Sequence, residues 1–111
     1  MRRGLHLEKG GAVITAFVLI NVERKVLPTI AERLVQVDGV AEVYSVAGEF
    51  DFVVVVRVAA YDDLARVVTE GLATQPGITA TETLMAFRCY SRHDLERMWN
   101  IGAEDPEPGM A

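Results

Sequence analysis

Two short motifs in this sequence have residue types that could bind a ligand, and the first of them suits a small zwitterion. The first is Ala47-Gly48-Glu49-Phe50-Asp51, in which backbone N–H groups beside Gly48 can hold an anion and the Asp51 carboxylate can hold a cation. The second is Thr81-Glu82-Thr83, whose two hydroxyls lie on one face if the segment is a strand. Taken alone, each motif is explained better as structure, the first as a hairpin turn and the second as a segment of high β propensity.

The residue types needed for nucleophilic catalysis or metal binding are few and scattered. The serines and histidines are Ser45, Ser91, His6 and His93. No Ser/His/Asp or Cys/His set emerges from these positions. His93 and Asp94 are a lone pair of possible metal ligands, and no phosphate-binding glycine loop is present. We therefore expect no catalytic residue, no metal and no cofactor, which argues against an enzyme.

Composition bounds the class of protein. The chain has 111 residues, which suits one domain, and half of them are hydrophobic, as in a globular protein. Its net charge is −5 and its pI is about 4.9, so it repels phosphate backbones. We therefore expect no direct binding to nucleic acid.

The single cysteine and the chain's start indicate a cytoplasmic protein. Cys89 cannot form an intrachain disulfide, and its place in an apolar alternating run predicts a buried thiol. Glycines and charges in the first ten residues interrupt any signal sequence, and the apolar run 12–22 has only eleven residues, too short to span a bilayer. We expect no membrane partner.

Hydrophobic periodicity predicts four strands and two main helices. A helix of about twelve residues, with Pro28 in its first turn, ends at Asp38-Gly39, and a second helix is capped by Asp62. The predicted strands are 12–22, 40–47, 52–59 and about 78–92, and a short terminal helix is predicted over 94–101. We interpret residues 1–10 as a flexible lead-in, 11–102 as one domain and 103–111 as a disordered acidic tail.

The element order βαββαβ predicts an α+β fold of the ferredoxin-like type. Right-handed crossovers place both helices on one face of a four-stranded antiparallel sheet. The strand 52–59 is apolar on both faces, interrupted only by Arg57, and the strand 12–22 is similar. Two helices can cover only one face, so the other would be an exposed apolar patch. We therefore expect a homo-oligomer, at least a dimer packed sheet to sheet.

At these residues the sequence resembles the effector-binding domain of the Lrp/AsnC regulators of amino-acid metabolism. The resemblance runs from about residue 12 to residue 90. It rests on the opening strand and helix with Pro28, on Val37-Asp38-Gly39-Val40, on Tyr44 through the Ala47–Asp51 motif to Phe52, on Gln75-Pro76-Gly77-Ile78 and on Thr81-Glu82-Thr83. It implies a dimeric α+β barrel that assembles into tetramers or octamers and binds a free amino acid between dimers. Carried over, the ligand-binding residues are Val46, Ala47, Gly48, Phe50, Asp51, Thr81 and Thr83.

Two departures from the family shape the functional hypotheses. No segment before residue 12 is long enough for the family's helix-turn-helix, so the chain looks like a stand-alone form that does not itself bind DNA. Ala47 stands where relatives often have Thr or Ser. The first hypothesis is an amino-acid-sensing module that acts on a full-length regulator by co-assembly. The alternatives are a small monooxygenase-like enzyme on a dimeric α+β barrel and a ligand-free structural oligomerisation domain.

Overall fold

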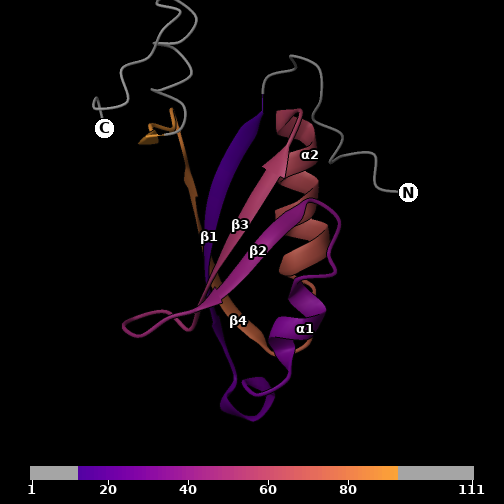
Figure 1. Cartoon of the computed structure of the whole chain (residues 1–111). Helices are drawn as coiled ribbons and strands as arrows, with labels where there is room; N and C mark the ends of the chain where they lie inside the picture. Colours follow the sequence, from indigo (N-terminus) through magenta and orange to yellow (C-terminus); the bar gives the residue numbers. More distant parts are fainter. Residues whose placement is uncertain (1–12, 93–111) are drawn as a thin grey trace, which may run out of the picture.

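The computed structural model describes residues 13–92, which are organised around one antiparallel sheet (Figure 1). The strands are β1 (Ile14–Val22), β2 (Val40–Ser45), β3 (Phe52–Val58) and β4 (Ile78–Met85), and they lie in the order β2-β3-β1-β4. The two strands predicted to be apolar on both faces, β1 and β3, are the central pair. The ferredoxin-like α+β prediction is confirmed.

The helices lie together on one side of the sheet (Figure 1). After β1 come a 3₁₀ turn, η2 (Arg24–Val26), and α1 (Ile30–Leu34). After β3 come α2 (Tyr61–Arg66) and its π-helical continuation η3 (Val67–Leu72). The main chain of Ala73 donates to the Val68 carbonyl at 2.9 Å, an i→i+5 bond that marks this wider turn.

Two helix predictions are wrong in detail. The first helix is shorter than the predicted twelve residues or so. Pro28 lies before it, between η2 and α1. After α1 the chain forms i→i+3 hydrogen bonds, such as that from Val37 N–H to the Leu34 carbonyl (3.1 Å), and the α-helix ends. Asp62 does not cap the second helix. That helix begins at Tyr61 with Ala60 as its N-cap residue, and no side chain caps it; the N–H groups of Asp63 and Leu64 donate to the Ala60 carbonyl.

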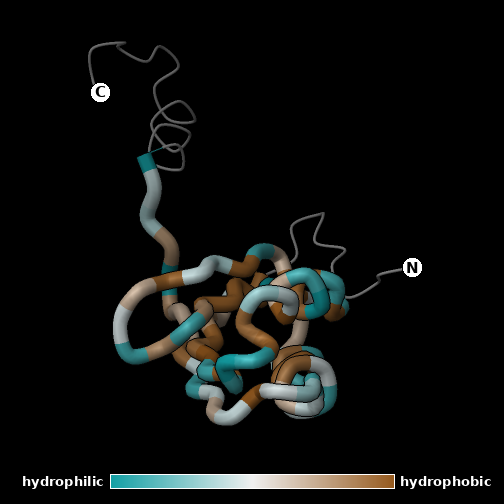
Figure 2. The backbone as a smooth tube through the Cα atoms, turned by 90° about the horizontal axis from the view of Figure 1, so that it is seen from below, coloured by the Kyte–Doolittle hydropathy of each residue, from teal (hydrophilic) through white to brown (hydrophobic). Residues whose placement is uncertain are grey.

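The core lies between the helices and the facing side of the sheet. Register brings Val18 opposite Val54 and Ile20 opposite Phe52, so these alternate side chains share one face. They are buried against Ile30, Leu34, Leu64, Val67 and Leu72. Figure 2, which looks along the strands, shows the hydrophobic segments gathered at the centre and the hydrophilic ones at the periphery. Burial of this set stabilises the domain by about 1.5–3 kcal/mol for each large side chain.

The other face of the sheet carries no helix from residues 13–92, and we call it the open face (Figure 1). Phe17 of β1 is 37% exposed and Leu84 of β4 is 46% exposed, while Val55 of β3 is buried among its neighbours on this face. Arg57 is the half-buried cation predicted to interrupt the apolar pattern of β3. The two-sided apolar pattern of the central strands is therefore real, and helices cover only one side of it.

Arg33 ties the first helix to the loop that leads into β4. Its guanidinium donates to the Pro76 carbonyl at 2.8 Å and to Gln75 Oε1 at 3.3 Å. The following residue, Gly77, has a φ of 99°, and a Cβ there would lie 2.5 Å from a methyl carbon of Val26. Only glycine permits this close approach, which fixes where β4 begins.

The fourth strand is shorter than predicted, and Cys89 is not buried. β4 ends at Met85, opposite Ala16, and the last bond runs from Ala86 N–H to the Thr15 carbonyl at 3.0 Å. Because β1 begins at Ile14, little strand remains for β4 to pair with. Cys89 is exposed and Phe87 is 99% exposed, so the prediction of a buried thiol is wrong.

Some predictions concern parts of the chain outside residues 13–92. The lead-in 1–10, the terminal helix 94–101 and the tail 103–111 lie outside the described residues. Within the described part, the structure contains no helix of the length and hydrophobicity that crossing a membrane requires.

Candidate functional site

The predicted ligand-binding motif forms the loop that joins β2 to β3, residues 46–51, and it projects away from the sheet (Figure 1). Val46 N–H donates to the Asp51 carbonyl at 3.1 Å and closes the loop beyond the last strand pair, Ser45 with Phe52. Residues 46–49 are exposed, and Phe50 and Asp51 are half-buried. Residues 46–49 of the loop are therefore open to solvent, while Phe50 and Asp51 pack at its base.

Position 48 favours glycine because of its backbone conformation, and not because a larger side chain would clash with its neighbours. Its φ is 125°, in the region that favours glycine, and a Cβ added to it would meet nothing within 4 Å. Gly48 and its neighbours Ala47 and Glu49 are exposed, so the tip of the loop is open to solvent.

Asp51 anchors this loop to β1 through its main chain and its side chain. Its N–H donates to the Ile20 carbonyl and to Asn21 Oδ1, both at 3.0 Å. Its Oδ2 accepts a hydrogen bond from Val22 N–H at 3.0 Å. β3 begins at Phe52, opposite Ile20, so Val22 has no β3 residue opposite it and the carboxylate replaces the missing carbonyl. This hydrogen bond gives the carboxylate a structural role, although the carboxylate has a second oxygen.

Thr81 and Thr83 lie on β4, on the far side of β1 from the loop. Register places Thr81 opposite Ile20 and Thr83 opposite Val18, so both share the face on which the helices pack. Thr81 is half-buried and Thr83 is exposed. The prediction that both threonines share one face holds. Within one chain, the seven predicted residues form two groups, separated by β1.

Sequence reasoning missed Asn21, whose side chain accepts the hydrogen bond from Asp51 N–H. The available signal was an amide side chain near the end of an otherwise apolar strand. Such a residue needs a partner when half-buried, and here the partner is 30 residues away in sequence.

On the open face, Tyr44 of β2 donates its hydroxyl to Glu42 Oε1 at 2.9 Å. This hydrogen bond, together with the negative charge of Glu42, raises the pKa of Tyr44 above its usual value. The phenol therefore stays neutral at physiological pH and is not a candidate base.

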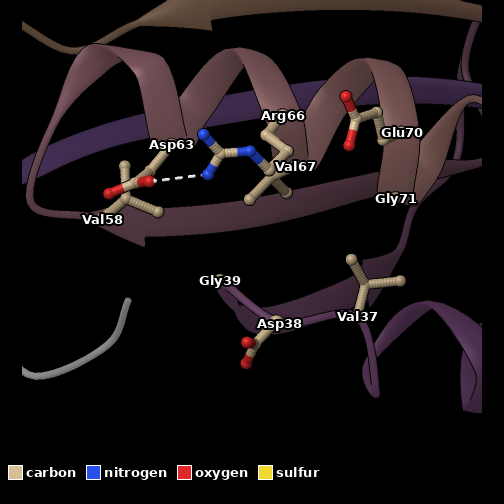
Figure 3. A pocket seen from close by; sticks show the side chains of 9 residues that line it. All are labelled: Val37, Asp38, Gly39, Val58, Asp63, Arg66, Val67, Glu70 and Gly71. Carbon is tan, nitrogen blue, oxygen red and sulfur yellow. Dashed lines mark hydrogen bonds and ion pairs between the residues drawn. The ribbon is translucent and has the colours of Figure 1, made fainter. Parts of the chain in front are cut away.

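A separate groove of about 270 Å³ lies between the turn Val37–Gly39 and the helix formed by α2 and η3 (Figure 3). Its lining residues are Val37, Asp38, Gly39, Val58, Asp63, Arg66, Val67, Glu70 and Gly71. Arg66 extends along the helix to Asp63, with 3.1 Å between Nη1 and Oδ1 (Figure 3). None of the predicted ligand-binding residues lines this groove. Its cationic side chain, Arg66, already forms an ion pair with Asp63.

The described residues offer no metal centre. Across residues 13–92, no three His, Cys, Asp or Glu side chains come together in a way that could hold an ion. The chemistry available is therefore hydrogen bonding from the loop backbone, from carboxylates and from threonine hydroxyls.

Sequence comparison identifies the kind of domain that carries this loop. The family described as the Lrp/AsnC ligand binding domain matches residues 15–95. The chain is similar to an uncharacterised HTH-type transcriptional regulator of Pyrococcus furiosus, with 37% identity over 76 residues, covering 66% of this chain and 51% of the regulator. The chain thus spans about half the length of the curated relatives it matches.

Two solved structures are similar in both sequence and fold. The crystal structure of TTHA0845 from Thermus thermophilus is 44% identical, with a TM-score of 0.67, and the match covers 71% of this chain and 99% of that chain. A feast or famine regulatory protein from M. tuberculosis, complexed with L-methionine, is 31% identical, with a TM-score of 0.59, and the match covers 71% of this chain and 54% of that chain.

Proposed function

Because this chain belongs to the Lrp/AsnC family through its ligand-binding domain, we propose that it binds a free amino acid as an effector and senses its concentration. The observation that carries the proposal is the loop at residues 46–51, which combines exposed main-chain N–H groups at a left-handed glycine with a carboxylate at its base. The M. tuberculosis relative was crystallised with L-methionine, which supports the ligand class.

The loop matches the two charges of an amino acid. N–H groups beside Gly48 receive the ligand carboxylate, and the Asp51 oxygen that Val22 does not use receives the ammonium. Val46, Ala47 and Phe50 surround the ligand. Thr81 and Thr83 supply hydroxyls from a neighbouring chain, since β1 separates them from the loop within one chain. Ala47 offers no hydroxyl, so the loop binds through its backbone at that position.

The open face accounts for assembly. A second copy packed on it would remove Phe17, Leu84 and their neighbours from water, which is favourable by about 25 cal/mol per Å² of apolar surface. We propose a sheet-to-sheet dimer and association of dimers into tetramers or octamers, with the loop at the contact between dimers. A ligand bound there shifts the assembly equilibrium by its preference for one state.

The chain acts without binding DNA itself. Its acidic charge disfavours contact with phosphates. We propose a cytoplasmic sensing module, not an enzyme, that influences a full-length regulator by co-assembly. A gel-shift titration at physiological salt should show no specific complex, and a complex at nanomolar protein would contradict this.

One observation favours a second candidate, a structural oligomerisation domain without a ligand. Asp51 Oδ2 is already used by Val22 N–H, so the aspartate has a role even if nothing binds. The two candidates differ in their response to amino acids.

A thermal-shift screen of the twenty amino acids separates them. A ligand at a hundred times its dissociation constant stabilises the native state by about 2.7 kcal/mol, which raises the melting temperature measurably. An increase with one or a few amino acids supports the sensor. No increase with any of them at millimolar concentration supports the structural domain.

A further inference from the structure

Asn21 lies where the two halves of the proposed site are joined. It belongs to β1, the strand between β3 and β4, and its side-chain oxygen accepts the Asp51 N–H at 3.0 Å. On its other side Asn21 pairs with Ala80, the residue before Thr81. Asn21 therefore contacts both the base of the loop and β4.

The contacts between residues 20–22 and Asp51 are reciprocal, and we call them the clasp. Asp51 N–H is shared between the Ile20 carbonyl and Asn21 Oδ1, and Val22 N–H returns a bond to Asp51 Oδ2, each at 3.0 Å. Two of these bonds use side chains, so their strength depends on the residues at positions 21 and 51. The Ile20 bond persists with any side chain at position 21.

The clasp lies beside an irregularity in the pairing of β1 with β4. The register shifts between Asn21, which is paired with Ala80, and Val22, which is paired with Ile78, so the extra residue of this bulge belongs to β4. On the side of β1 that faces β3, Val22 N–H donates to the Asp51 carboxylate because β3 begins at Phe52 and has no residue opposite Val22.

We propose that Asn21 is a positioning residue for the amino-acid site. Its amide oxygen holds the Asp51 main chain, and Val22 then fixes the Asp51 carboxylate through Oδ2, so that the remaining oxygen and the N–H groups near Gly48 keep the spacing that a zwitterion needs. Asn21 acts through Asp51 and does not touch the ligand. This inference rests on the proposed function.

Binding measured by calorimetry on three variants tests the role of Asn21. Asn21→Ala removes the acceptor but leaves the Ile20 bond, so the protein should fold and bind its amino acid about ten-fold more weakly. Asn21→Asp retains an acceptor oxygen at the same place and should restore affinity to within about three-fold of the wild type. Thr74→Ala is the matched control, because it removes a side-chain bond to the Glu70 carbonyl (2.7 Å) far from the loop in sequence, and its affinity should be unchanged.

Amide hydrogen exchange reports on the clasp without ligand. In Asn21→Ala the N–H groups of Asp51 and Val22 should exchange faster, while those of the core strands keep their rates. In Thr74→Ala all of these rates should match the wild type.

Each remaining outcome overturns a defined statement. Unchanged affinity in Asn21→Ala removes the positioning role while the proposed function stands. Equal loss of binding in Asn21→Asp and Asn21→Ala shows that an acceptor oxygen at position 21 is not sufficient, which also contradicts positioning. A wild type that binds none of the twenty amino acids overturns the proposed function, and the inference falls with it.

Discussion

The two faces of the central strands both carry apolar side chains but differ in their environment. On one face, Val18 and Val54 are fully buried by helices of the same chain. On the other, which also carries Arg57, Phe17 and Val53 lie beside them in sequence, and no helix of residues 13–92 covers that face. Apolar side chains on the two faces therefore do not have the same role. The first face stabilises the single domain, and the second is available for a second copy.

The largest effect is expected from a charge on the helix-covered face. Val18→Asp would bury an unpaired carboxylate between sheet and helices, at a cost of several kcal/mol, comparable to the whole stability of a small domain. Circular dichroism should show a protein that is unfolded, or melts far below the wild type. A melting temperature close to that of the wild type would mean that this face is not the core.

The adjacent residue gives the matched experiment on the open face. Phe17→Asp places the carboxylate where a single chain leaves the side chain 37% exposed, so the charge can be hydrated in the monomer but not within a sheet-to-sheet dimer. We expect a folded protein with the mass of a monomer by size exclusion with light scattering. A monomeric wild type at micromolar concentration would refute the dimer.

Features that depend on neighbouring residues in the sequence could be predicted, and features that depend on distant residues could not. Strand alternation is local, so the two-sided pattern around Arg57 could be predicted. The residue at which β4 ends is not determined by the residues next to it in the sequence. It depends on where β1 begins, which is why Cys89 was placed wrongly in the core.

The candidate site divides in the same way. The loop residues Gly48 and Asp51 were recognisable as a motif. The use of Asp51 by Val22 and Asn21 was not, because it joins residues 29 and 30 positions apart at a bulge that no local pattern specifies. The groove beside Arg66 likewise depends on tertiary packing between a turn and a helix.

A smaller effect is expected at the tip of the loop. Gly48→Ala forces an L-residue to a φ of 125° but introduces no clash, so the cost is backbone strain of about 1–2 kcal/mol. The melting temperature should fall slightly and amino-acid binding should weaken, as measured by thermal denaturation and calorimetry. Binding equal to that of the wild type would show that the N–H groups beside Gly48 do not contact the ligand.

The two faces of the sheet do not decide what the loop does, and the Asp51 carboxylate is the group on which the sensor and the structural domain differ. Asp51→Asn retains an oxygen that can accept from Val22 N–H, so the fold and the assembly should survive. It loses the negative charge that holds the ligand ammonium, which contributes about 1.5–3 kcal/mol.

The most direct test is therefore isothermal titration calorimetry of wild type and Asp51→Asn with the amino acid that stabilises the wild type, alongside light scattering on both. The sensor account predicts two proteins of the same mass, with affinity for the amino acid lower by about ten-fold to a hundred-fold in the variant. Equal affinity in the two proteins would contradict it and leave Asp51 as a structural anchor of the loop.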